Sequence, residues 1–137
     1  MENKKLAVIL NEKLDAGKAA NALAHAMLGF GAGAVTKEEV RLNKYEGADG
    51  KVHENISEMG IVVLRASSGK IRTIKNAAAQ AGLKYVDFVD TMSIGTYEEE
   101  YALTKTKKDE ELNYWALILF GDFGRVTELT GKLSLYK

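Results

Sequence analysis

Residues 5–30 read KLAVILNEKLDAGKAANALAHAMLGF, and this stretch decides the class of fold. Residues 5–11 form an apolar run that is too short for a helix and apolar enough for a central strand. Asp15 then stands at a helix N-cap position, and residues 16–30 are rich in alanine, leucine and methionine, which favour a helix. A buried strand followed directly by a helix is typical of layered α/β proteins.

The same alternation continues along the chain. Further strands are predicted by three apolar runs, at residues 60–66, 83–89 and 114–120. Residues 70–82 predict a second helix, which ends in glycine. We therefore expect a single three-layer α/β domain over residues 1–137, with a mixed sheet of about four strands and helices on both faces.

Shorter elements complete this expectation. Residues 36–39 carry a capping-box pattern that opens a short helix or turn, and residues 43–58 predict a loop or hairpin. A short helix is expected after Asp122, and residues 132–136 form a tail or an edge strand. Three glycines at 29–33 predict the end of the first helix and a flexible loop, because they follow a helix and lack the spacing of a nucleotide-binding loop.

Residues 91–112 are charged and irregular, and they are most simply a solvated loop. A loop of about twenty residues is uncommon in so small a domain, and active-site lids and binding loops are frequent among such exceptions.

Composition excludes several classes of protein. The 137 residues carry 19 basic and 19 acidic side chains, so an extended, sequence-blind phosphate-binding surface is not expected. The chain has no cysteine, which excludes a disulfide scaffold and a thiolate nucleophile. Its two histidines lie in no metal-binding pattern, so we expect neither a metal nor a cofactor. No apolar run spans a bilayer and no signal peptide is recognised, so we expect no membrane association and a cytoplasmic location.

Four polar residues are candidates for chemistry. Lys18, Asn21 and His25 share one helix face at spacings i, i+3 and i+7. Asp90 follows the third strand, and ligands of open α/β sheets lie beyond the carboxyl ends of strands. A cation, an amide, an imidazole and a carboxylate could orient a water, transfer protons and hold an anionic ester or phosphate. In the alternative interpretation, Lys18 is a solvated charge and His25 a hydrogen-bonded histidine at a helix interface.

Three stretches resemble a known family. They are residues 5–27, residues 60–90, and residues 115–136, which read WALILFGDFGRVTELTGKLSLY. Together they resemble peptidyl-tRNA hydrolases of the second, archaeal and eukaryotic type. More narrowly, they resemble a small bacterial family, domain of unknown function 2000, thought to share that fold. The resemblance implies that the last long strand runs antiparallel to the others.

The resemblance also implies roles for individual residues. Lys18 matches the family's catalytic lysine, His25 its helix histidine and Asp90 its essential aspartate. Asn21 stands where the hydrolases carry glutamine, and it is a candidate for binding substrate. Two further candidates for substrate binding are Thr91, directly after the aspartate, and Thr130, in the closing tail.

Three functions stay open at this point. The first is an esterase or amidase that acts on a small substrate. The second is a module of the same fold that binds a small molecule or a partner without catalysis. The third is peptidyl-tRNA hydrolysis, with tRNA as the partner, although Glu98–Glu100 are expected near the site and would repel an RNA backbone. The apolar closing strand and tail could also form the edge of a homodimer.

Overall fold

The computed structural model describes residues 3–137. Five strands form its central sheet, in the order β5-β6-β1-β4-β7. They are β1 (Lys4–Asn11), β4 (Ile61–Ala66), β5 (Lys84–Val89), β6 (Tyr114–Asp122) and β7 (Ser134–Leu135). The expectation of about four strands is corrected to five, because the short β7 pairs with the edge of β4.

The sheet is mixed, as expected. β1 and β4 pair in parallel, whereas β6 lies between β1 and β5 and runs antiparallel to both. The antiparallel direction of this last long strand is the one that the family resemblance implied. Because β6 runs opposite to its neighbours, its first residues lie at the end of the sheet where β1 and β5 finish.

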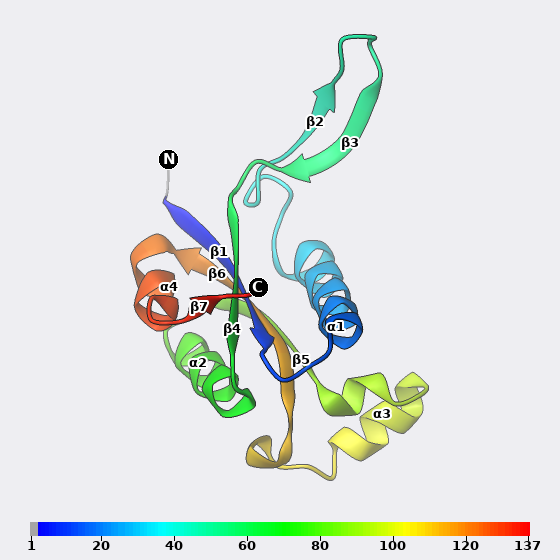
Figure 1. Cartoon of the computed structure of the whole chain (residues 1–137), viewed down its shortest axis with the longest axis vertical. Coiled ribbons are helices and arrows are strands. Elements are labelled where there is room, and N and C mark those ends of the chain that lie inside the picture. The colour runs from blue at the N-terminus through cyan, green and yellow to red at the C-terminus, as the bar shows by residue number, and fades with distance from the viewer. Residues whose placement is uncertain (1–2) are drawn as a thin grey trace.

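Helices cover both faces of the sheet, as Figure 1 shows. Helix α1 (Ala16–Gly29) packs on one face, and α2 (Ser68–Gln80) and α4 (Phe123–Thr130) pack on the other. In β1, Leu6, Val8 and Leu10 face the α1 side, and Ala7 and Ile9 face the α2 side. All five are buried, because a central strand covered on both faces has no solvent-facing side.

Helix α1 ends at Gly29, the first of the three glycines that were expected to end it. The segment that follows is not the flexible loop that was expected, because it forms a π-helical turn, η1 (Phe30–Ala34). Phe30, 1% exposed, packs into the core on this side and holds the extra turn against the sheet. The α-helix therefore ends as predicted, and the predicted loop is corrected to a π-helical turn.

Residues 43–58 form a hairpin, the second of the two alternatives expected for them. Strands β2 (Leu42–Glu46) and β3 (Val52–Ser57) pair antiparallel as a separate two-stranded sheet. Figure 1 shows this hairpin projecting away from the central sheet. Most of its side chains are exposed, including Val52 and Ile56.

The segment 91–112 is more ordered than the sequence indicates. It contains η2 (Asp90–Ser93), α3 (Tyr97–Thr104) and η3 (Asp109–Glu111). Helix α3 begins with a reciprocal capping box: the Thr96 hydroxyl accepts from Glu99 N at 3.3 Å, and the Glu99 carboxylate accepts from Thr96 N at 3.1 Å. No residue of α3 is buried, so it lacks the apolar stripe by which a helix is recognised.

Within residues 3–137, no helix is both long enough and apolar enough to cross a bilayer.

Candidate functional site

The candidate site forms where three strand ends meet. β1 and β5 end at the same edge of the sheet at which β6 begins. Asp90 follows β5 directly, and Asn113 precedes β6 directly. The two residues are joined twice, since Asp90 N donates to Asn113 O at 3.0 Å and Asn113 N donates to the Asp90 carboxylate at 3.1 Å. This pair holds the exit of β5 beside the entrance of β6.

The end of β1 is tied to the same place. Asn11, 3% exposed, donates to Tyr114 O at 2.8 Å and to the Asn113 side chain at 3.2 Å. The side-chain oxygen of Asn11 accepts from Lys13 N at 2.9 Å, which turns the chain toward α1. The helix then begins at its cap, where the Asp15 carboxylate accepts from Lys18 N at 2.9 Å. Lys18 is thereby carried to the same edge as Asp90.

An open pocket of about 610 Å³ lies at this edge. Four of the six predicted site residues line it: Lys18, Asn21, Asp90 and Thr91. The remaining lining residues are Gly17, Ser93, Ile94, Leu103, Lys107 and Trp115. The structure therefore brings the ammonium group and the carboxylate, which the sequence placed on distant segments, to one solvent-accessible space.

Lys18 and Trp115 meet on one wall of this pocket. The Lys18 Nζ atom lies 5.9 Å from the centre of the Trp115 ring, within the range of a cation–π contact. Within the described residues, the Lys18 ammonium makes no ion pair. The charge is therefore held over an aromatic surface and left available to an anionic group of a ligand.

Thr91 is a buried member of the pocket. It is 2% exposed, and its hydroxyl oxygen lies 2.6 Å from that of Thr104 in α3. The Thr104 hydroxyl also donates to Glu100 O at 2.7 Å. Thr91 therefore joins the exit of β5 to the last turn of α3, a supporting contact that its predicted role in substrate binding did not include.

His25 lies outside the pocket, two turns further along α1. Its ring stacks on Phe88 with the centroids 5.5 Å apart, and Phe88 in turn contacts Trp115 at 5.8 Å. A row of rings thus runs from His25 to the pocket wall. His25 can support that wall through Phe88, but the structure does not place its nitrogens beside Asp90.

Thr130 is not part of this site. It lies in α4, on the opposite face of the sheet from α1. It is 2% exposed, and its hydroxyl donates to Val126 O within its own helix at 2.8 Å. The predicted group of six residues is therefore divided into four in the pocket, one behind its wall and one on the far face.

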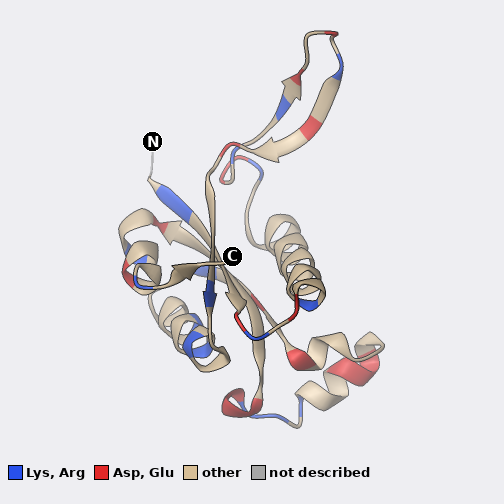
Figure 2. Cartoon of the chain, in the orientation of Figure 1, with Lys and Arg blue, Asp and Glu red and all other residues tan. Residues whose placement is uncertain are grey.

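The acidic run on α3 is directed elsewhere. None of the residues Glu98–Glu100 lines the pocket. Glu99 caps α3, and the Glu100 carboxylate accepts from Gly95 N at 3.2 Å. Figure 2 shows the acidic positions on α3 and on the turn that precedes β6. The electrostatic barrier expected from these carboxylates is not built into the pocket lining itself.

Residues that the sequence reading missed supply the rest of the lining. Ile94, Leu103 and Lys107 all come from the segment that was interpreted as a solvated loop. Trp115 lies in the apolar run at residues 114–120 that predicted a strand, yet it is only partly buried and lines the pocket. The unusual length of the segment and its capping box were the two signals that could have identified it as part of the site.

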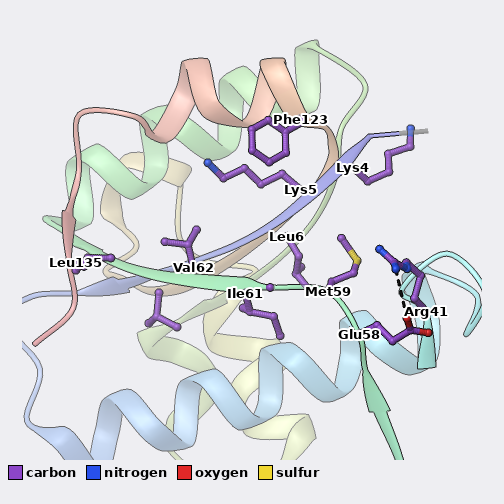
Figure 3. Close-up of a pocket in the computed structure, with 12 residues that line it drawn as sticks. Lys4, Lys5, Leu6, Arg41, Glu58, Met59, Ile61, Val62, Phe123 and Leu135 are labelled. Carbon is purple, nitrogen blue, oxygen red and sulfur yellow. Dashed lines mark hydrogen bonds and ion pairs between the residues drawn. The ribbon is translucent and has the colours of Figure 1, made fainter. Parts of the chain in front are cut away.

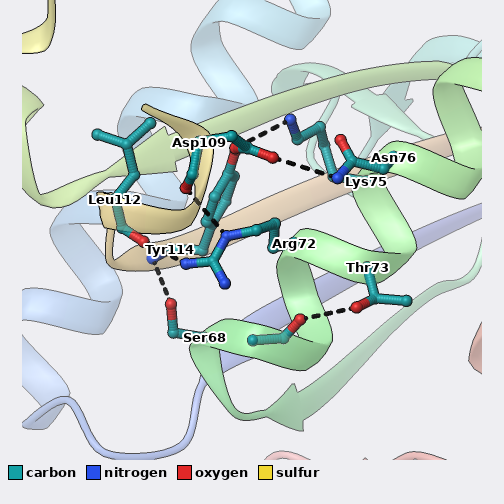
Figure 4. Close-up of polar contacts among 9 residues, drawn as sticks. Ser68, Arg72, Thr73, Lys75, Asn76, Asp109, Leu112 and Tyr114 are labelled. Carbon is teal, nitrogen blue, oxygen red and sulfur yellow. Dashed lines mark hydrogen bonds and ion pairs between the residues drawn. The ribbon is translucent and has the colours of Figure 1, made fainter. Parts of the chain in front are cut away.

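A polar cluster fixes the far end of this segment to α2, as Figure 4 shows. The Tyr114 hydroxyl donates to the Asp109 carboxylate, which also accepts from Asn76 at 3.2 Å and lies 3.4 Å from the Lys75 ammonium. Arg72 donates to the backbone oxygens of Asp109 at 3.0 Å and of Leu112 at 2.6 Å.

The contacts in this cluster shift the pKa values of Asp109 and Tyr114. The hydrogen bond from Tyr114 holds the pKa of Asp109 below its usual value. Burial, reinforced by the hydrogen bond to Asp109, raises the pKa of Tyr114 to about 12. The cluster is therefore made of an ionised carboxylate and a protonated phenol at neutral pH. It anchors the segment that covers one side of the pocket.

A second hollow, of about 500 Å³, lies at the base of the hairpin (Figure 3). Its polar groups are already engaged within the protein. Lys5 donates to the Thr127 hydroxyl at 3.0 Å, and Arg41 pairs with Glu58 at 3.3 Å. It holds none of the residues predicted for chemistry. Within residues 3–137, no three side chains of metal-ligating type are grouped.

Comparisons with known proteins agree with this architecture. The solved structure of a protein of unknown function, Atu0240 from Agrobacterium tumefaciens strain C58, matches with a TM-score of 0.84 and 21% identity over 100% of both chains. At this identity the likeness shows the fold alone. A search of curated proteins gives no match. A family model described as "Protein of unknown function (DUF2000)" matches residues 4–137, so the chain belongs to the DUF2000 family.

Proposed function

We propose that the chain is a hydrolase of small acyl esters or amides, on a fold related to that of the type II peptidyl-tRNA hydrolases. One observation carries this proposal: Lys18, Asn21 and Asp90 line one open pocket although they come from different segments. The antiparallel direction of β6 supports the related fold. We treat residues 1–137 as one domain of this type.

The chemistry assigned to the pocket is attack of water on an ester or amide carbonyl. One Asp90 oxygen accepts from Asn113 N, and the second is available to accept a proton from water. The water oxygen bonds to the carbonyl carbon, and Lys18 stabilises the charge that develops on the carbonyl oxygen. The bond to the leaving alcohol or amine then breaks, and the proton passes from Asp90 to that group. Asn21 orients the substrate by hydrogen bonding.

The test is hydrolysis of p-nitrophenyl butyrate by the wild type and by Asp90→Asn. Because general-base catalysis contributes about a hundredfold or more, we expect kcat/KM to fall by about that factor. Asp49→Asn is the matched control, since Asp49 lies at the exposed tip of the hairpin. Equal rates for the two variants would remove Asp90 from the mechanism.

A second candidate function is binding without catalysis. The observation that favours it is that Ile94, Leu103 and Lys107 of one segment form a side of the pocket, while His25 remains outside. A thermal-shift screen with nucleotides, amino acids and aminoacyl analogues would then give stabilisation without turnover. Release of peptide from peptidyl-tRNA at low salt would instead assign the chain to the third function, a peptidyl-tRNA hydrolase.

A further inference from the structure

The candidate pocket has one apolar side and one polar side. Ile94, Leu103 and Trp115 present apolar surface, and Ile94 is 57% exposed although it is a large hydrophobic residue. Lys18, Asn21 and Asp90 form the polar side. A pocket divided in this way suits a ligand that has an apolar chain at one end and a polar group at the other.

The charges that line the pocket are unequal. Two lysines, Lys18 and Lys107, face a single carboxylate, that of Asp90. Among the described residues, neither lysine makes an ion pair, whereas the Asp90 carboxylate already accepts from Asn113 N. The lining therefore favours an anion, and it offers one ammonium group more than the hydrolysis of an ester requires.

We infer that the ligand is an acylated amino acid or a similar acyl compound with a free carboxylate. Its apolar chain lies on Ile94, Leu103 and Trp115, its scissile carbonyl lies at Lys18, and its carboxylate is held by Lys107. The reaction at the carbonyl depends on the proposed function. The binding of the ligand depends only on the residues that line the pocket. Lys107 is then a residue that determines specificity.

The experiment uses N-octanoylglycine and its neutral isostere, N-octanoylglycinamide. Trp115 is the one tryptophan of the chain, so its fluorescence reports directly on occupancy of the pocket. Binding is measured with the Asp90→Asn variant, in which turnover is expected to be about a hundredfold slower, and thermal shift provides a second readout. We expect N-octanoylglycine to bind more tightly than the amide, and the preference to weaken as salt is added.

Lys107→Gln is the decisive variant. An exposed ion pair contributes at most about 1 kcal/mol, so we expect the variant to bind N-octanoylglycine about two- to fivefold more weakly, with no change for the amide. Lys105→Gln is the matched control, because Lys105 lies two residues away and contacts the Tyr101 ring outside the pocket. Equal binding of the two compounds by the Asp90→Asn protein, or equal effects of Lys107→Gln and Lys105→Gln introduced into it, would overturn the inference.

The two proposals fail separately. Selective binding of the carboxylate without any Asp90-dependent turnover would remove the proposed hydrolysis and leave the inference intact. Turnover that depends on Asp90 but shows no preference for a carboxylate would support the proposed hydrolysis and overturn the inference about the ligand.

Discussion

Replacement of Tyr114 by phenylalanine tests the polar cluster that anchors the end of the 91–112 segment. The Tyr114 hydroxyl donates to the Asp109 carboxylate, and the residue is 2% exposed. A hydrogen bond to a charged group contributes about 1.5–3 kcal/mol. Because Asn76 and Lys75 still contact Asp109 in the variant, we expect the free energy of unfolding at pH 7 to fall by about 1.5 kcal/mol.

The same substitution changes how stability depends on pH. Burial and the hydrogen bond to Asp109 raise the pKa of Tyr114 to about 12, from an ordinary value of 10.0. Between these values the folded protein keeps a proton that the unfolded chain has lost, so stability falls as the pH rises. Two units at about 1.36 kcal/mol each correspond to a loss of about 3 kcal/mol. This contribution is fully present below pH 10.

Urea unfolding at intervals between about pH 9 and pH 12 measures this loss. The wild type should lose stability more steeply than Tyr114→Phe, so its advantage at pH 7 should shrink as the pH rises above 10 and should be lost before pH 12. Tyr101→Phe is the control, because Tyr101 is 52% exposed and should follow the wild type. Parallel pH curves for the wild type and Tyr114→Phe would refute the proposed coupling between burial and ionisation.

Three further predictions concern the helices. Gly131→Ala would place a Cβ 2.9 Å from the backbone oxygen of Thr127, which cannot move without distorting α4, so we expect a loss of about 1–3 kcal/mol in urea unfolding. Gly69→Ala meets no atom within 4 Å in α2 and should add about 0.5–1 kcal/mol; a loss of stability there would contradict the steric argument. Asp15→Ala removes the cap that accepts from Lys18 N and should cost about 1 kcal/mol in the same assay, whereas Asp15→Asn, which keeps the acceptor oxygen, should stay close to the wild type.

The main elements of the fold follow from local patterns in the sequence. β1, β4, β5 and β6 lie where short apolar runs predicted strands, because burial on both faces leaves an unbroken apolar run. Helix α3 could not be predicted in this way, since all its residues are at least partly exposed and its helical state depends on the Thr96–Glu99 capping box. The order of the strands could not be predicted from local patterns either, because β6 pairs with β1, which lies near the other end of the sequence.

The candidate site was predictable only on its polar side. Lys18 and Asp90 were predicted to lie close together because ligands of open α/β sheets bind beyond the carboxyl ends of the strands. Both residues line the pocket, and the prediction needed only the topology of the sheet. The apolar side was missed because Leu103 and Lys107 lie in a segment that has no helical or strand periodicity. The sequence did not predict that His25 lies outside the pocket. Spacing along a helix shows which residues share a face, but it does not show what that face contacts, and here His25 contacts Phe88.

The position of β6 between β5 and β1 has a consequence for biosynthesis. Its first residue, Tyr114, accepts a hydrogen bond from Asn11 at the end of β1, 103 positions earlier in the chain. In the described sheet, β6 is also the sole strand beside β5. While the ribosome is still extending the chain, β1 therefore has one open edge and β5 has two. Contacts over such separations are slow to form, so the pocket at these strand ends is completed only after residues 114–122 have been synthesised.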